Sequence, residues 1–320
     1  AGGVGCAISV LLSVRASQDP LHGQEDNVSA SAQGTRLRWA PGRTERPSVR
    51  RMALPPPAPD RTALVTGASS GIGEAIARDL ASRGHGVALV ARSADKLAEL
   101  AAELRGSGVR AEVIAADLTD RSVRASLLEQ VTDLGLVADI LVNNAGRSTV
   151  GSVAAADPAA EMHMIELDVV AVVDLTVRFL PGMVERGRGG ILNVASTGAF
   201  QPLPGQAGYG GCKAFVLSYT RSLGGELKGT GVHATALCPG PVRTGFIEAA
   251  GFDKQEAEAA LPGFMWESAE AVAKTGLDGL AANHPVAIPG TANRIGATFG
   301  HLAPKRLLVP LLASRHPGLK

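Results

Sequence analysis

From residue 61 onward, short apolar runs alternate with longer amphipathic segments, and this alternation limits the folds open to the chain. The runs are "TALVT" (62–66), "GVALVA" (86–91), "AEVIAA" (111–116), "DILVN" (139–143), "GILNVA" (190–195) and "HATALC" (233–238). Such short apolar runs are typical of strands buried on both faces of a parallel sheet. Helical patterns such as "GEAIARDLASRG" (73–84) and "SADKLAELAAELRG" (93–106) separate them. The alternation predicts an α/β fold with a doubly wound parallel sheet in three layers, α/β/α.

We predict a single folded domain with an extra segment at each end. Residues 1–51 carry seven arginines, no lysine and no sustained hydrophobic period, so we expect a disordered or non-native leader, with Met52 as the natural start. A transit peptide is the alternative for this stretch, although its four acidic residues weaken that interpretation. The domain is expected over residues 52–290, where "VAIPG" (286–290) adds a last strand, and residues 291–320 form a C-terminal tail.

Charge and cysteine usage exclude several classes of protein. The formal net charge is +1, which gives no electrostatic reason to expect nucleic acid as a partner. The three cysteines have no CxxC spacing and the histidines no ligand spacing, so we predict no metal site and a reducing, cytoplasmic location. No apolar run is long enough for a transmembrane helix.

The first strand is followed by "TGASSGIG" (66–73), which has the properties of a phosphate-binding turn. Its glycines permit a tight turn and close approach of the backbone to a pyrophosphate, and the following helix offers free N–H groups. The strand, turn and helix stand in the order that dinucleotide binding requires. The predicted contacts are Gly67, Ser69, Ser70, Gly71, Ile72 and Gly73.

The end of the second strand indicates which dinucleotide is bound. An acidic residue about 20 positions after the glycines would bind the 2′-hydroxyl of NAD. The chain has Arg92 there instead, and a guanidinium suits a 2′-phosphate. We therefore predict NADP in preference to NAD; the alternative is that Arg92 is a solvated loop residue.

Five motifs in order resemble those of one family. They are "TGASSGIG", "NNAG" (143–146), Ser196, "YGGCK" (209–213) and "PGPVRT" (239–244). Over about residues 60–290 the chain resembles the short-chain dehydrogenase/reductase family, in its compact single-domain branch with a Rossmann-type fold. The resemblance implies Ser196, Tyr209 and Lys213 as catalytic residues and a homodimer or homotetramer. It implies further cofactor contacts from Asp117, Leu118, Asn144, Ala145, Gly146, Tyr209, Lys213, Pro239, Gly240, Val242 and Thr244.

Tyr209 and Lys213 are four positions apart, so on a helix they share a face. A phenol has a pKa near ~10, and a neighbouring ammonium is expected to lower it. Tyr209 would then donate a proton to a substrate oxygen in reduction and accept it in oxidation, with Ser196 bonding the same oxygen.

Two departures from the family pattern affect this site. Asp168 stands where the family commonly has asparagine. It either raises the pKa of Tyr209 and partly neutralises Lys213, or faces away and bonds to helix backbone. Gly210 and Gly211 lie inside the catalytic motif and predict a looser helix start, at roughly 1 kcal/mol each relative to alanine. Cys212 has no evident base partner and is read as a packing residue.

The segment after "PGPVRT" contains Phe246, Phe252, Phe264, Met265 and Trp266, which suits an apolar carbonyl or alcohol substrate or, equally, a lid packed on the body. The tail could rest on a membrane surface, but Pro304 and Pro310 interrupt it, so docking on the body or a partner subunit is favoured. The leading interpretation is an NADP-dependent oxidoreductase acting on a ketone/secondary alcohol pair. The alternative is a dinucleotide-binding regulatory or scaffold protein with weakened catalysis. A sugar-nucleotide epimerase fits the glycine spacing less well.

Overall fold

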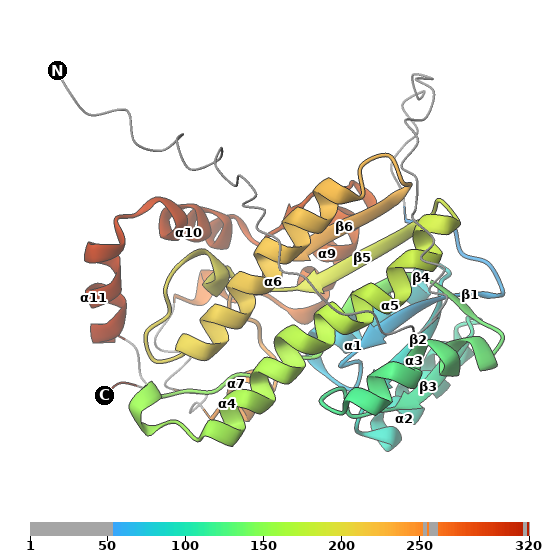
Figure 1. The fold of residues 1–320 in the computed structure, drawn as a ribbon, viewed down its shortest axis with the longest axis horizontal. Helices are drawn as coiled ribbons and strands as arrows, with labels where there is room; N and C mark the ends of the chain where they lie inside the picture. The colour runs from blue at the N-terminus through green and yellow to red at the C-terminus, as the bar shows by residue number, and fades with distance from the viewer. Residues whose placement is uncertain (1–53, 252–254, 256–261, 316–318, 320) are drawn as a thin grey trace, which may run out of the picture. The chain divides into compact units, whose positions relative to one another are not determined.

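A computed structural model describes residues 54–251, 255, 262–315 and 319 (Figure 1). The predicted leader and Phe252 lie outside these residues. The strands are β1 (Arg61–Thr66), β2 (Gly86–Ala91), β3 (Ala111–Ala115), β4 (Val137–Asn143), β5 (Gly189–Val194), β6 (Val232–Leu237) and β7 (Val286–Ala287). Helices α1 to α5 span Gly71–Ser82, Ala94–Gly106, Arg121–Asp133, Pro158–Ile165 and Ala171–Glu185. The later helices are α6 (Ala207–Glu226), α7 (Phe246–Ala249), α9 (Ala269–Ala281), α10 (Thr291–Leu302) and α11 (Lys305–Arg315).

The described strands form one parallel sheet in the order β3-β2-β1-β4-β5-β6-β7. The chain moves outward from β1 to β3 and then crosses back to place β4 on the other side of β1. The loops that follow β1 and β4 therefore leave the sheet in opposite directions. Open α/β sheets bind ligands in the crevice between two such loops. The predicted doubly wound fold is confirmed, including the last strand, which is only two residues long.

Helices cover both faces of the sheet because the buried strands carry apolar residues on alternate sides. Ala63 and Val65 of β1 pack with α1, α2 and α9, whereas Leu64 faces α3, α5 and α6. Figure 1 shows the second set of helices in front of the sheet. This sandwich fixes the strand ends that carry the motifs.

Four irregular turns in the described residues lie around the carboxyl edge. Between α4 and α5 the chain forms one π-helical turn, η2 (Glu166–Val170), which contains Asp168. The short 3₁₀ turns η1 (Val153–Ala155), η3 (Thr197–Phe200) and η4 (Gly263–Met265) belong to loops after the strands. None of the helices in the described part of the chain is long and apolar enough to cross a membrane.

Candidate active site

The turn after β1 requires glycine at two positions. Gly67 has a φ of +65°, and a Cβ there would lie 2.8 Å from the Asn144 Nδ2 atom. A Cβ on Gly73 would lie 2.3 Å from the carbonyl oxygen of Gly67. Side chains at these positions would push α1 away from the turn, so the glycines bring the helix N-terminus to the end of the strand.

The N-terminus of α1 is open toward this turn. Ser70 precedes the helix in an extended conformation, and its side chain makes no capping hydrogen bond within the described residues. The first-turn N–H groups are thereby left for an anion, together with the positive end of the helix dipole. Ser69 and Ile72 are half-buried beside it. The Thr244 side chain lies over Gly71, with its Cγ2 3.2 Å from the position of a Cβ there. Segments more than 170 residues apart thus meet at one anion-binding turn.

Thr66, at the end of β1, joins this turn to the "NNAG" segment. Its hydroxyl donates to the carbonyl of Val142 at 3.1 Å and accepts from the backbone N–H groups of Asn144 and Ala145 at 2.9 and 3.0 Å. Asn144 donates its side-chain N–H to the Thr66 carbonyl at 2.9 Å. Asn144 therefore supports the turn through its side chain. Thr66 was not predicted as a site residue, although a polar residue closing an apolar strand was the available signal.

Arg92 and Asp117 follow the neighbouring parallel strands β2 and β3. Arg92 is exposed, whereas the Asp117 carboxylate accepts from the Thr119 backbone N–H at 2.9 Å and from its hydroxyl at 2.8 Å. The Thr119 N–H bond is the main cause of the lowered pKa of Asp117, to which the Arg92 charge contributes. Asp117 therefore stays ionised beside the cationic loop.

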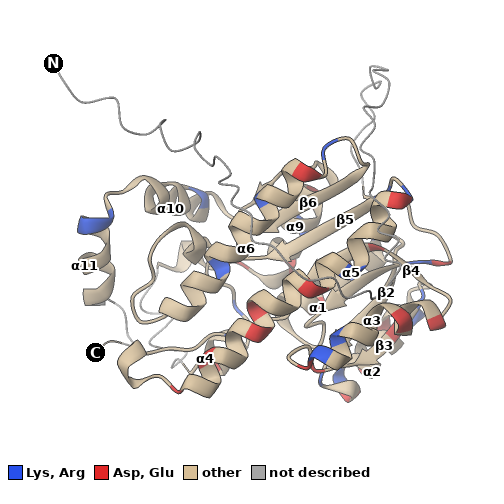
Figure 2. Cartoon of the chain, viewed as in Figure 1, with Lys and Arg blue, Asp and Glu red and all other residues tan. Residues whose placement is uncertain are grey.

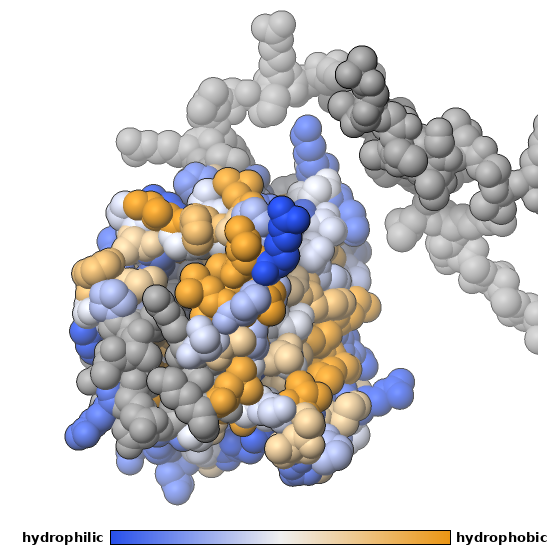
Figure 3. Space-filling view, turned by 90° about the vertical axis from the view of Figure 1, so that its left-hand side faces the viewer, coloured by the Kyte–Doolittle hydropathy of each residue, from blue (hydrophilic) through white to orange (hydrophobic). Residues whose placement is uncertain are grey.

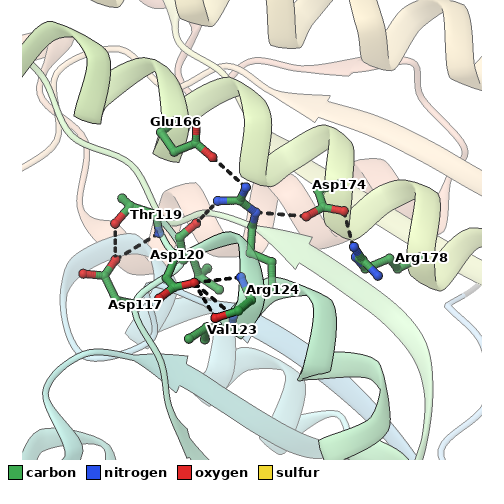
Figure 4. Close-up of polar contacts among 10 residues, drawn as sticks. Asp117, Thr119, Asp120, Val123, Arg124, Glu166, Asp174 and Arg178 are labelled. Atoms are coloured by element: carbon green, nitrogen blue, oxygen red, sulfur yellow. Dashed lines mark hydrogen bonds and ion pairs between the residues drawn. The ribbon is translucent and has the colours of Figure 1, made fainter.

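A buried arginine ties the loop after β3 to the π-helical turn (Figure 4). Arg124 of α3 is 1% exposed, and its guanidinium donates to the carbonyl of Leu118 at 2.7 Å. It also pairs with Glu166 at 2.6 Å and Asp174 at 3.0 Å. Its fork of donors holds three partners from two segments in a fixed relation. The burial of Arg124 was not predicted, because most residues of its helix are polar.

The loop after β6 is fixed to its surroundings. The Pro239 carbonyl accepts from the Thr197 N–H at 2.8 Å, and a Cβ on Gly240 would lie 2.3 Å from Asn293 Oδ1. Val242 is buried and forms a bridge with Glu267. The predicted contact residues of this loop therefore lie on backbone that has little freedom to move.

Tyr209 and Lys213 lie on one face of α6, as their spacing predicts. The Lys213 ammonium is 5.6 Å from the centre of the Tyr209 ring, and the Ser196 side chain is close enough to Tyr209 to lower the pKa of its phenol. Ser196 follows β5 and caps η3, accepting the Gly198 N–H at 3.0 Å. The structure therefore brings the three predicted catalytic side chains together.

Asp168 completes this cluster. It is fully buried, and its Oδ2 lies 2.9 Å from the Lys213 Nζ atom. Its Oδ1 accepts the backbone N–H of Arg147 at 2.8 Å, while Lys213 donates to the Val194 carbonyl at 3.2 Å. A Cβ on Gly146 would lie within 3.1–3.3 Å of both charged groups. The alternative that Asp168 faces away and bonds to its own helix backbone is wrong.

Burial sets the direction of the pKa shifts in the cluster. It raises the pKa of the Tyr209 phenol; Lys213 and Ser196 oppose the rise, and Asp168 adds to it. Burial alone would lower the pKa of Lys213, but the Asp168 carboxylate holds it above its ordinary value. Lys213 therefore lowers the pKa of Tyr209 as expected, but desolvation of the phenol outweighs this effect and the net pKa is raised.

The glycines of the motif do not break the helix. α6 is continuous over 20 residues, since Gly210 packs on Leu203 and the helix has tertiary support along its length. Cys212 is buried, and burial raises the pKa of its thiol to about 11, which agrees with a packing role.

The chain resembles known proteins in sequence. The sequence profile described as "short chain dehydrogenase" matches residues 61–255, more than half of the chain. The chain belongs to the short chain dehydrogenase family. The putative ketoacyl reductase 1 of the granaticin polyketide synthase from Streptomyces violaceoruber is 41% identical over 199 residues, which cover 61% of this chain and 73% of that protein.

Solved structures of the family share the fold of this short-chain dehydrogenase. A short-chain dehydrogenase from Sphingobium yanoikuyae in complex with NADPH has a TM-score of 0.67 at 34% identity, covering 78% of this chain and 95% of that one. The actinorhodin polyketide ketoreductase with NADPH has a TM-score of 0.65 at 32% identity, covering 74% and 97%. The chain is thus an oxidoreductase of this family.

A cavity of about 300 Å³ reaches the first turn of α6 in this dehydrogenase. It lies between the loop after β4, the start of α6 and the end of α7, and its lining includes Arg147, Thr149, Glu161, Gly208 and Ala250. Among the described residues, no cluster of three or more His, Cys, Asp or Glu side chains could hold a metal ion.

The described aromatic residues after β6 differ in location: one borders the candidate catalytic cluster, and the others lie on the body or at the surface. The Phe246 ring lies 6.0 Å from the Tyr209 ring, centre to centre, so it borders the candidate catalytic cluster. Trp266 is buried against the body under the Arg243 guanidinium, and Phe264 points to solvent. Phe246 is thus an aromatic neighbour of Tyr209 but not part of the cavity lining. Trp266 packs on the body, as the lid interpretation expects.

Proposed function

We propose that this chain is an NADP-dependent oxidoreductase that interconverts a ketone and a secondary alcohol, with Tyr209 as general acid and base. The observation that carries the proposal is the convergence of Ser196 and Lys213 on the Tyr209 side chain, together with the open glycine turn. Folding alone does not require these three side chains to meet, so their convergence indicates a function.

The residues present fit a phosphorylated dinucleotide. The Gly67–Gly73 turn would hold the pyrophosphate, because its glycines leave room for close approach and α1 presents free N–H groups. Arg92, exposed after β2, would bind the 2′-phosphate through its planar donors. Asp117 and Leu118 would border the adenine, and Thr244 the carboxamide. The relatives with 34% and 32% identity were solved with NADPH, which supports the same choice here.

Each side chain of the cluster has a separate task in reduction. When bound, NADPH supplies the hydride that reaches the carbonyl carbon. Tyr209 donates its proton to the carbonyl oxygen, while Ser196 donates a hydrogen bond to that oxygen and orients it. Lys213 stabilises the phenolate that forms when Tyr209 gives up its proton. In oxidation the same phenolate accepts the proton of the alcohol.

Lys213 keeps one donor for the cofactor. An ammonium has three N–H groups. One of them is donated to the Val194 carbonyl, the ammonium forms an ion pair with Asp168, and a remaining N–H would bond the nicotinamide ribose. Asp168 acts through Lys213 and is a positioning residue in this scheme.

The substrate is proposed to be an apolar ketone, including ketoacyl groups. Phe246 offers an apolar wall next to Tyr209, and the cavity of about 300 Å³ suits a small ligand. Ketoacyl groups are included because the 41% identical relative is named a ketoacyl reductase.

A homodimer or homotetramer in a reducing compartment such as the cytoplasm fits the remaining features. Val177 of α5 and Phe215 of α6 are exposed apolar residues on helices that cover one face of the sheet. The described cysteines, Cys212 and Cys238, are both free and buried. A light-scattering mass above that of one chain would support the oligomer.

The experiment that tests the function is NADPH consumption against a panel of apolar ketones and ketoacyl thioesters, with NADH run in parallel. The proposal expects consumption of NADPH with some members of the panel. NADPH binding without turnover on any of them would instead support the alternative, a regulatory or scaffold protein that only binds the dinucleotide.

A further inference from the structure

Helix α10 turns its large apolar side chains away from the body. Ile295, Phe299 and Leu302 are 66%, 64% and 74% exposed, and their spacing of four and three residues places them in one stripe. The buried positions Ala297 and Gly300 lie on the opposite side of the helix. A helix that only needed to cover the body would bury the large residues and expose the small ones.

Helix α11, which follows Pro304, also exposes large apolar side chains. Leu308 is buried against the rest of the chain, whereas Leu307 and Leu311 are 67% and 47% exposed. Contiguous apolar surface of this kind is rare on a monomer unless it contacts something. Figure 3 views the molecule from the side on which α10 and α11 lie, and apolar residues gather on that side.

The charged residues of α10 and α11 are all basic. No aspartate or glutamate follows Asp278 in the sequence, whereas residues 283–320 contain Arg294, Lys305, Arg306, Arg315 and Lys320. Figure 2 shows basic and no acidic residues on α10 and α11, in contrast to the mixed charges of α1 to α5. An apolar stripe flanked by lysine and arginine matches the interface of an anionic bilayer in both polarity and charge.

The side of α10 opposite this face anchors the helix to the body. α10 packs on the loop that begins at Ser196: a Cβ on Gly300 would lie 2.3 Å from Gln201 Oε1, and the rings of Phe200 and His301 are 6.4 Å apart.

We propose that the outward face of α10 and α11 docks on the surface of an anionic lipid bilayer, without crossing it. The described apolar side chains of the face, Ile295, Phe299, Leu302, Leu307 and Leu311, enter the boundary between headgroups and acyl chains. Arg294 and Arg306 pair with lipid phosphates at its edge. This binding is independent of the proposed catalytic function and goes beyond it.

The test is sedimentation of the full chain with vesicles of phosphatidylcholine alone and with vesicles that also contain phosphatidylglycerol. We expect binding to the anionic vesicles that weakens as salt is added. The double variant Phe299→Ser/Leu302→Ser should lower the partition coefficient at least about tenfold, since two large apolar contacts are lost. Arg306→Gln should lower it about fivefold on anionic vesicles only. Val177→Ser, which changes an equally exposed apolar residue on α5, should bind like the unchanged chain.

Three results would overturn the proposal. The chain could stay in the supernatant with both kinds of vesicle, or bind them equally at every salt concentration. It could also fail to bind while Phe299→Ser/Leu302→Ser reduces the mass measured by light scattering without lipid, which would assign the face to a second copy of the chain. None of these readouts depends on NADPH turnover, so they leave the proposed catalysis to its own test.

Discussion

Asp168 and Lys213 form an ion pair that is almost wholly removed from water, at 0% and 5% exposure. A buried pair of this kind is held by its mutual attraction and by additional hydrogen bonds, here from the Arg147 N–H and to the Val194 carbonyl. Its presence beside Tyr209 makes the negative charge of Asp168 part of the electrostatics of the phenol. Where the family commonly has a neutral asparagine, this chain has a charged group that favours protonated Tyr209.

Asp168→Asn is expected to shift the pH profile of catalysis. Because Asp168 contributes to the raised pKa of Tyr209, its neutralisation should lower that pKa. Reduction needs the protonated phenol, so the alkaline limb of its kcat/KM profile should move to lower pH. Oxidation needs the phenolate, so its rate at neutral pH should rise. Glu166→Gln, in the same turn but paired with Arg124, is the control and should move neither limb. Identical profiles for Asp168→Asn and the unchanged chain would refute the coupling.

Lys213→Met is expected to destabilise the fold by about 3–5 kcal/mol, because it leaves the Asp168 carboxylate buried without its cation. Adding Asp168→Asn should restore most of this loss, since a neutral amide can stay buried with the Arg147 N–H. Urea unfolding of the four chains in a double-mutant cycle measures the coupling. Additive effects would show that the two groups do not depend on each other.

Arg92→Ala is expected to raise the KM for NADPH about tenfold or more and to leave the KM for NADH nearly unchanged, because only the 2′-phosphate bond is lost. Initial rates with both cofactors measure the ratio. Arg105→Ala, at the far end of α2, is the matched arginine control. Equal losses for the two cofactors would contradict the assignment of Arg92.

At the scale of elements, α6 shows how one helix can carry both folding and chemistry. Its glycines differ in what surrounds them: a Cβ on Gly208 would lie 2.1 Å from Glu161 Oε2 and 2.6 Å from Met164 Cε, whereas nothing lies within 4 Å of one on Gly211. Gly208 thus allows the α4 side chains to approach the start of the helix, and Gly211 leaves open space.

Gly211→Ala should therefore stabilise the protein by roughly 1 kcal/mol, as alanine is the better helix former, and raise Tm by about 2–4 °C. Gly208→Ala should lower Tm, because Glu161 and Met164 must move aside. Thermal unfolding followed by circular dichroism compares the two variants. Equal changes in Tm of the same sign for both variants would mean that helix propensity, and not packing against α4, determines the stability of this turn.

Sequence patterns predicted the elements well and the site partly, for physical reasons. Strands buried on two faces must be apolar, so β1 to β6 stand out, and a glycine turn between strand and helix is a local feature. The orientation of Asp168 could not be read, because a π-helical turn inserts a residue and rotates the following face of the helix. Arg124 was equally hidden: its two acidic partners, Glu166 and Asp174, lie 42 and 50 residues further along the chain, so the helix pattern gives no sign of its burial.

For the whole molecule, fold, cofactor turn and buried cluster are proposed to serve one proton transfer through Tyr209. The most direct test is Tyr209→Phe, which removes one hydroxyl and keeps the ring against Phe246. NADPH binding is measured by fluorescence titration and reduction of a ketone substrate by single-turnover absorbance on the same samples. We predict unchanged NADPH affinity and a rate reduced by ~10²-fold or more, as expected when a positioned acid is lost. A variant that binds NADPH and reduces the ketone as fast as the unchanged chain would contradict the central role of Tyr209.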